Sequence, residues 1–202
     1  MAAVKHGVMG GTFDPVHIGH MKLAEHAQQE LGLDDVLWIT AGDPWRKGDR
    51  KITPARHRLA MVQLAIEVYP SWLASTVEID RSGPTYTVDT LRELRARQDG
   101  DSFTLIVGQD ALEDLPNWHE PTRLLELADL AVAVRGSRRL PPEELDSLVP
   151  GLSGRVTWLS MPLVPFSATQ VRRLASSGAP LSGFVPKSVE AYIREHRLYR
   201  AG

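Results

Sequence analysis

Two histidines that lie three residues apart behind a pair of glycines form the most chemically informative segment of this chain. The run from Gly10 to His20 reads GGTFDPVHIGH and directly follows a short apolar segment. Glycine has no Cβ, so a ligand can approach the backbone closely there and unusual dihedral angles are allowed. A helix beginning near His17 would project both imidazoles from one face, beside amides that have no partner within the helix. We therefore expect a phosphate site in which His17 and His20 stabilise charge or donate a proton.

Other interpretations of the histidine pair remain open. A metal ion would need a third ligand, but the sequence places none nearby and the chain has no cysteine. A solvated or helix-capping pair would leave the neighbouring glycines unexplained. The chain lacks the dinucleotide fingerprint GxGxxG, the Walker A lysine and the GxSxG nucleophile elbow, so those three site classes are excluded.

Composition sets broad limits on the class of protein. With 202 residues, 43% hydrophobic residues and a net charge of −2, the chain is typical of one globular domain. This charge gives no general attraction to nucleic acid or to an anionic membrane. The absence of cysteine excludes disulfides and thiolate chemistry and fits a reducing compartment. We expect a cytoplasmic protein with a single domain over residues 1–202, without a signal segment, a membrane span or a nucleic-acid partner.

Apolar segments with strand character alternate with amphipathic helical segments, which predicts parallel pairing in an open α/β sheet. We expect strands at 4–9, 36–39, 73–79, 103–107, 130–134 and 156–159. Helices are expected to begin near His17, at Thr53-Pro54 with Thr53 as the cap, and at 87–97, 121–127, 168–176 and 187–196. The polar segment 137–154 is expected to be a surface excursion. Ligands of such sheets bind at the carboxyl ends of the strands.

Two further segments carry groups that suit anions. The first segment, at 45–58, is basic, and its cations are Arg46, Lys47, Arg50, Lys51, Arg56 and Arg58. Three interpretations of this segment are open: a solvated loop, a patch that binds RNA, or a lid over an anionic ligand. The second opens a helix at Ser167, with Thr169 and Arg172 on one face of the first turn. It is either a second phosphate cradle or an ordinary capped helix. Two phosphate sites suit a triphosphate and a phosphorylated acceptor, whose anionic phosphate needs no general base.

These segments resemble the bacterial nicotinate-mononucleotide adenylyltransferases of the HxGH nucleotidyltransferase superfamily. The resemblance covers nearly the whole chain and rests on residues 10–20, on RSGPTYTVDTL at 81–91 and on IVGQDAL at 106–112 followed by Trp118. It also rests on SATQVR at 167–172, and on Val185-Pro186 and the segment that follows. Ala168 and Gln109 depart from the usual pattern, in which a serine and a small residue stand at these positions.

The resemblance implies a Rossmann-like open parallel sheet with helices on both faces, and a C-terminal helical part at 166–202 that completes the ATP site. It implies transfer of the adenylyl group from ATP to nicotinate mononucleotide, giving deamido-NAD and pyrophosphate. Because the sequence has no compact carboxylate cage, we expect Mg²⁺ to be held through the ATP phosphates, with no protein metal site. A homo-oligomer stays open. The catalytic residues would be His17 and His20. ATP would be bound by Gly10, Gly11, Thr12, Phe13, Gly108, Asp110, Ser167, Thr169 and Arg172, and the acceptor by Lys47, Thr85, Tyr86 and Trp118.

Thr85, Tyr86 and Thr87 present consecutive amides and hydroxyls at the start of the helix at 87–97, and we assign substrate selectivity to the Thr85 region. Free amides at a helix N-terminus favour a carboxylate over a neutral amide, so we expect the acid, nicotinate, to be preferred over nicotinamide. Two rival functions remain. A pantetheine-phosphate adenylyltransferase is disfavoured by residues 83–87 and Trp118. A non-catalytic nucleotide-binding or RNA-binding module is disfavoured by the two histidines and Arg172, and measured turnover separates it from an enzyme.

Overall fold

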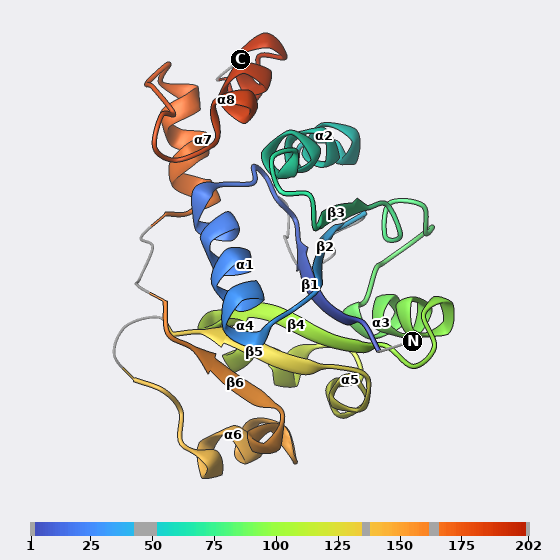
Figure 1. The fold of residues 1–202 in the computed structure, drawn as a ribbon. Helices are drawn as coiled ribbons and strands as arrows, with labels where there is room; N and C mark the ends of the chain where they lie inside the picture. Colours follow the sequence, from blue (N-terminus) through green and yellow to red (C-terminus); the bar gives the residue numbers. More distant parts are fainter. Residues whose placement is uncertain (1–2, 43–51, 135–137, 162–165, 201–202) are drawn as a thin grey trace.

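The computed structural model describes residues 3–42, 52–134, 138–161 and 166–200. Across these residues the chain forms one sheet of parallel strands, in the order β3-β2-β1-β4-β5-β6 (Figure 1). The chain order reverses between β1 and β4, which is the place where open α/β sheets bind ligands. The expected Rossmann-like sheet is confirmed. The strands are β1 (Lys5–Gly11), β2 (Asp35–Thr40), β3 (Trp72–Ser75), β4 (Ser102–Gly108), β5 (Asp129–Ala133) and β6 (Val156–Leu159).

Helices cover both faces of the sheet, and each face has its own hydrophobic core. Figure 1 shows α1 and α2 on one side of the strands and α3 and α5 on the other. The first core is formed with α1 (Ile18–Leu31), α2 (Ala55–Ile66), α7 (Ala168–Ser176) and α8 (Lys187–Glu195). The second core is formed with α3 (Thr87–Arg97), α4 (Gln109–Glu113), α5 (Pro121–Leu127) and α6 (Pro142–Leu148). None of the helices in the described ranges has the length and apolar character of a membrane span.

The close fit of α1 against β1 explains several small residues. Ala24 and Ala27 face the sheet and are fully buried. A Cβ on Gly7 of β1 would lie 2.9 Å from side-chain carbons of Leu33 and Ile106, so only glycine fits there without a shift of its neighbours. The helix ends at Gly32, whose φ of 60° lets its amide bond the carbonyl of Gln28. The packing therefore holds the first turn of α1 directly behind the carboxyl end of β1.

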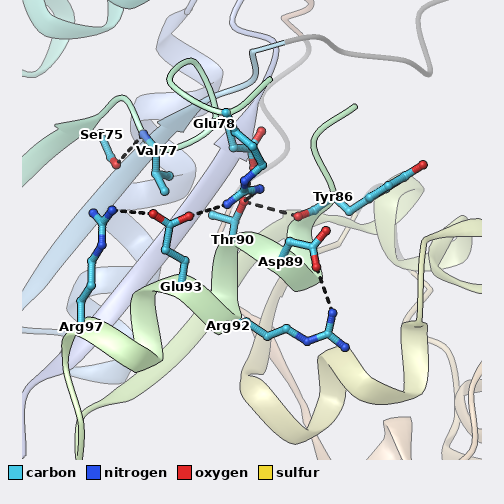
Figure 2. Close-up of polar contacts among 10 residues, drawn as sticks. Ser75, Val77, Glu78, Tyr86, Asp89, Thr90, Arg92, Glu93 and Arg97 are labelled. Carbon is cyan, nitrogen blue, oxygen red and sulfur yellow. Dashed lines mark hydrogen bonds and ion pairs between the residues drawn. The ribbon is translucent and has the colours of Figure 1, made fainter. Parts of the chain in front are cut away.

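The third strand is shorter than its apolar pattern predicts. We expected a strand over 73–79, but β3 ends at Ser75 and a turn follows. The Ser75 hydroxyl accepts from the amide of Val77 (Figure 2). The Thr76 hydroxyl donates to Asp80. Short hydroxyl side chains that bond nearby groups compete with a strand ladder in this way. The prediction was wrong because it counted the apolar residues and not the two hydroxyls.

The polar segment 137–154 contains a helix that sequence reasoning missed. Pro142 occupies the first turn of α6, and Glu143 and Glu144 follow it in the same turn. Both features favour a helix start. Leu145 anchors the helix in the core and is 3% exposed.

The prediction that Thr53 caps α2 was also wrong, because α2 begins at Ala55 after Pro54 and has no side-chain cap.

A buried histidine joins the amino ends of three strands, far from the carboxyl ends where ligands bind. His6 is 3% exposed. Its Nδ1 lies 2.8 Å from Asp35 and its Nε2 lies 3.2 Å from Asp101. Burial by itself lowers the pKa of His6, but the hydrogen bonds and charges of the two carboxylates outweigh burial and raise the pKa above the usual 6.5. Imidazolium is therefore the form that this site stabilises.

We expect His6 to stabilise the fold most in acid. A raised folded-state pKa means that the contribution is complete below about pH 6.5, the unfolded value, and is lost as the pH rises through the folded-state pKa. Urea unfolding of the parent and of His6→Gln at pH 6 and pH 9 measures this. The stability difference between the two proteins should shrink at the higher pH. A difference that grows with pH would contradict the assigned charge.

Candidate active site

Two cavities open at the carboxyl ends of the strands and meet at Gly11 and Thr12, which line both. The first cavity has a volume of about 440 Å³. Besides the two shared residues, it is lined by Gly10, Ala41, Glu78, Thr85, Tyr86, Thr87, Leu105, Val107, Asp114, Trp118 and His119. The second cavity, of about 770 Å³, is lined by Phe13, Asp14, His17, His20, Gly108, Asp110, Ser167, Thr169, Arg172 and neighbours. The two cavities can therefore hold two molecules whose reacting ends meet at the shared residues.

The glycines at the strand ends leave space for these molecules. A Cβ at Gly10 or Gly108 would meet no atom within 4 Å, so each glycine borders open space. Gly10 lines the first cavity and Gly108 the second. This agrees with the expectation of close ligand approach to bare backbone. The expectation of unusual dihedral angles was wrong for Gly10 and Gly11, because both continue β1 and pair with β2.

The unusual backbone belongs to Phe13, whose φ is 48°. A bulky residue in the left-handed region costs on the order of 1 kcal/mol and needs support from its surroundings. The Phe13 ring is 3% exposed and lies 5.4 Å from Trp38 and 5.2 Å from His20, centroid to centroid. The loop between β1 and α1 is thus held in a strained shape by core contacts directly beside the histidines.

The two histidines stack on each other at the start of α1. Their ring centroids are 3.7 Å apart and their planes are inclined by 21°. The backbone N–H of His17 donates to Nδ1 of His20 at 3.2 Å. An Nδ1 that accepts a hydrogen bond carries no proton, so the neutral His20 ring presents Nε2–H as its donor. His20 is one of the residues that line the second cavity.

His17 is held in the neutral form. The side chain is buried, and burial lowers its pKa from 6.5 to about 4. Its Nδ1 is buried with no hydrogen-bond partner among the described residues, so nothing there stabilises a second proton. A stacked neighbour also disfavours two positive charges. In the free protein at neutral pH, His17 is therefore a neutral donor or acceptor and not a cation.

The C-terminal part of the chain reaches the loop between β1 and α1 from the outside. The Ile18 amide donates to the carbonyl of Phe184 at 2.9 Å, so one amide that we expected to be free at the start of α1 is already bonded. The Tyr199 hydroxyl donates to Asp14 at 2.9 Å. Burial, and then the Asp14 charge, raise the pKa of Tyr199. These contacts hold the C-terminal part of the chain against the loop that precedes α1.

The start of α7 has the geometry that its sequence predicts. The Ser167 hydroxyl caps the helix by accepting from the Gln170 amide at 3.2 Å. Arg172 donates to the Thr169 hydroxyl at 2.9 Å and to the carbonyl of Asp14 at 2.7 Å. All of these residues except Gln170 line the second cavity, together with the histidines. The cationic guanidinium and the opening of α7 thus face the same space as the first turn of α1.

The first cavity is bordered by aromatic residues and by the start of α3. Tyr86 is the N-cap of α3, and its ring stacks on His119 with centroids 4.4 Å apart. Thr85 is buried, and Trp118 lies beside His119 on the same cavity wall. The predicted Thr85, Tyr86 and Trp118 are therefore brought together. His119 was missed, and its position next to Trp118 was the only signal for it.

Sequence reasoning also missed a carboxylate in the first cavity. Glu78 is 8% exposed and accepts from the Thr90 hydroxyl at 2.8 Å. Figure 2 shows this contact beside Tyr86, with Asp89 and Glu93 further along the same helix. Arg81 reaches both Thr90 and Glu93. The network orients the first two turns of α3 against the turn that follows β3.

At the end of β4, Gly108 is the N-cap of the short helix α4, and Asp110 lies in its first turn. Both residues line the second cavity, where the resemblance places the adenosine. Gln109, which replaces the usual small residue, is 8% exposed and donates to Glu113 at 2.9 Å. The Gln109 side chain is thus held by a hydrogen bond to a residue one turn further along α4.

The basic segment has a different organisation from the one expected. Lys47, Arg46, Arg50 and Lys51 lie outside the described residues. Arg58 does not belong to a solvated patch, because its side chain is 1% exposed and donates to three backbone carbonyls. The helical period of α2 could have predicted the burial of Arg58, because Arg58 lies one turn before the buried residues Met61 and Val62 and therefore on the same face.

Comparisons with known proteins identify the family. Residues 8–174 match the cytidylyltransferase-like family. A probable nicotinate-nucleotide adenylyltransferase of Dehalococcoides mccartyi is 42% identical over 201 residues, covering 98% of both chains. A relative with the same description from Thermomicrobium roseum is 43% identical over 194 residues, covering 96% of this chain and 91% of its own.

The fold matches two structures of the Plasmodium falciparum nicotinic acid mononucleotide adenylyltransferase. The form complexed with NaAD has a TM-score of 0.79 at 17% identity, and the form complexed with APC has a TM-score of 0.76 at 16% identity. Each match covers 97% of both chains. The fold, the full-length sequence matches and the motifs in the two cavities agree, and the chain belongs to the nicotinate-nucleotide adenylyltransferases of the cytidylyltransferase-like family.

Proposed function

We propose that the protein transfers the adenylyl group of ATP to nicotinate mononucleotide, giving deamido-NAD and pyrophosphate. The observation that carries this proposal is the junction of two cavities at Gly11 and Thr12. The larger cavity has the histidines and Arg172, which suit a triphosphate, and the smaller has aromatic rings and the start of α3, which suit a pyridine ring. The Plasmodium falciparum enzyme with the same fold is complexed with NaAD in one structure, which supports a two-substrate site here.

In this reaction an oxygen of the acceptor phosphate attacks the α-phosphorus of ATP. The new P–O bond forms as the bond to the bridging oxygen breaks, and pyrophosphate leaves with the electron pair. The chain has to align the two phosphates and neutralise the charge that develops on the leaving group. We assign charge neutralisation to His20 Nε2–H, to neutral His17 and to Arg172, and alignment to Gly10, Gly11, Thr12 and Phe13 at the junction.

The remaining contacts follow from the two cavities. Gly108 and Asp110 are assigned to the adenosine, and Ser167 and Thr169 to the triphosphate. Thr85, Tyr86 and Trp118 are assigned to the nicotinate half, and Lys47 to a phosphate. Trp118 can stack on the positively charged pyridinium ring. We place the reaction in the cytoplasm, because the chain is free of cysteine. The substrates are small molecules, and no nucleic acid takes part.

Mg²⁺ is proposed to be bound by the ATP phosphates and water. Mg²⁺ prefers oxygen ligands and retains several waters when it accompanies a nucleotide. Within the described ranges, no three His, Asp or Glu side chains come together as metal ligands. His20, Thr169 and Arg172 face the larger cavity as donors for phosphate, so they fit a metal that is bound through phosphate. When bound, the ion would withdraw charge from the phosphates.

A pyrophosphate-release assay tests the proposal. We expect turnover only when ATP, nicotinate mononucleotide and Mg²⁺ are all present, and a chelator should abolish it while the circular dichroism spectrum stays unchanged. Pantetheine phosphate serves as the rival acceptor. Turnover with pantetheine phosphate and none with nicotinate mononucleotide would overturn the assignment of the acceptor. Full activity in excess chelator would overturn the role of Mg²⁺.

A further inference from the structure

A single buried arginine connects three segments that surround the junction of the cavities. Arg58 lies in the first turns of α2. Its Nη1 donates to the Thr12 carbonyl at 2.8 Å, its Nη2 to the Gly42 carbonyl at 3.1 Å and its Nε to the Thr53 carbonyl at 2.8 Å. The planar guanidinium carries donors in a fixed fork, so the three carbonyls are held in fixed relative positions.

Each of these carbonyls belongs to a segment next to the proposed site. Thr12 lines both cavities. Gly42 follows β2 and packs so tightly that a Cβ on it would lie 2.1 Å from the Glu78 carbonyl. Glu78 itself lines the first cavity. Thr53 precedes α2. Arg58 therefore couples the loop at the junction to one wall of the first cavity.

The bond to Thr12 has a direct effect on the strained residue beside it. Because a peptide unit is planar, a Thr12 carbonyl that points to Arg58 leaves the Phe13 N–H pointing away from Arg58. On the other side of Phe13, the Asp14 carbonyl is held by Arg172 at 2.7 Å. The left-handed Phe13 is thus bracketed by two carbonyls that are each bonded to an arginine. Strained residues persist when neighbouring contacts determine their geometry.

A purely structural role explains Arg58 poorly. Burying a guanidinium requires its desolvation, and a well-packed apolar residue often stabilises a core equally well. The acceptors of Arg58 are neutral carbonyls. The Asp14 carboxylate, which contributes a favourable charge interaction, accepts from Tyr199. The fork of Arg58 is therefore used to orient backbone groups.

We propose that Arg58 is a positioning residue for adenylyl transfer, which aligns the Thr12–Phe13 peptide at the point where the two substrates meet. The inference rests on the proposed function, because it concerns the alignment of those two substrates. Arg58 touches neither cavity. Its loss should therefore misalign bound substrates and lower kcat, and should leave substrate binding largely intact.

The test compares Arg58→Lys with Arg95→Lys. Lysine keeps the charge but cannot form the three-way fork. Arg95 is the matched control, since it also donates to a backbone carbonyl, that of Leu127 at 2.7 Å, and lines neither cavity. Misplacement by about 1 Å can cost on the order of 10² in rate, so we expect kcat of Arg58→Lys to fall by about 10- to 100-fold. The KM values of both substrates should change less than about threefold. Arg95→Lys should match the parent.

Guanidinium rescue extends the test to a larger truncation. Arg58→Ala leaves a space of guanidinium shape, and low concentrations of guanidinium should restore part of its kcat without raising that of the parent. Thermal unfolding identifies the temperature at which each variant stays folded. A folded Arg58→Lys with parental kcat, or with a change confined to KM, would overturn the positioning role. A parent that releases no pyrophosphate with nicotinate mononucleotide would overturn the proposed function instead.

Discussion

Alanine in place of His17 or His20 is expected to lower kcat by a factor on the order of 10² to 10³. The two rings stack at the start of α1, the His17 amide favours the Nε2–H tautomer of His20, and both residues line the larger cavity. A donor aimed at charge that develops during reaction stabilises the transition state more than the ground state, so the KM values should change less than about threefold. Steady-state kinetics with each substrate varied in turn measures both effects.

His26→Ala is the matched control for these variants. His26 lies on the same helix, and its Nδ1 is 2.8 Å from the Lys22 carbonyl, outside both cavities. It should retain parental kcat. His20→Ala also removes the acceptor of the His17 amide, so its thermal unfolding has to be compared with that of the parent. A rise in KM with unchanged kcat would show that the histidines only bind ATP.

Thr87→Pro is expected to reduce the preference for the acid over the amide mononucleotide by about 10-fold, since one lost hydrogen bond to a charged group weakens binding by about 1.5 to 3 kcal/mol. Thr87 is the first residue of α3 and lines the first cavity. Proline removes its N–H and is tolerated at the first position of a helix. The preceding residue, Tyr86, has φ −111° and ψ 137°, which a following proline allows.

The preference for the acid is expected because of the hydrogen-bonding groups at the start of α3. Free amides and the positive end of the helix dipole favour a carboxylate, whereas an amide group would place an NH₂ donor against donors. Thr87→Ala is the control for the lost hydroxyl, because it keeps the amide. Lys187→Pro, at the first position of α8, is the control for proline itself. An unchanged acid preference in Thr87→Pro would remove the helix start from the account of specificity.

The sheet and most of the helices could be predicted from the sequence, because their signals are local. Apolar segments alternate with helical periods, and parallel strands bring their carboxyl ends to one edge. The motifs after β1 and β4 therefore had to lie near each other. The errors came from competing local chemistry. The hydroxyls of Ser75 and Thr76 ended β3 early. The prolines at 141 and 142 suggested a loop, although they lie at the start of α6.

The parts of the site that sequence reasoning missed depend on long-range contacts. Arg58 lies in a sequence segment whose basic composition is typical of a surface. Its side chain nevertheless points inward and donates to carbonyls from three segments. The Tyr199 hydroxyl donates to Asp14, which is 185 positions away in the sequence. The Phe184 carbonyl accepts a hydrogen bond from the Ile18 amide. No pattern within one helix or strand specifies such pairs. Burial also decides the charge of His17, whose pKa of about 4 depends on packing and not on residue type.

The most direct test of the central claim is the ratio of kcat/KM for nicotinate mononucleotide to that for nicotinamide mononucleotide, measured on the parent with Mg²⁺ and ATP and with the dinucleotide product identified by mass. A site built from matched hydrogen-bond donors rejects a mismatched analogue strongly, and we expect a ratio of at least about 10² in favour of the acid. The product should be deamido-NAD, formed in equal amount to pyrophosphate. Equal use of both mononucleotides, or ATP cleavage without a dinucleotide product, would contradict the account.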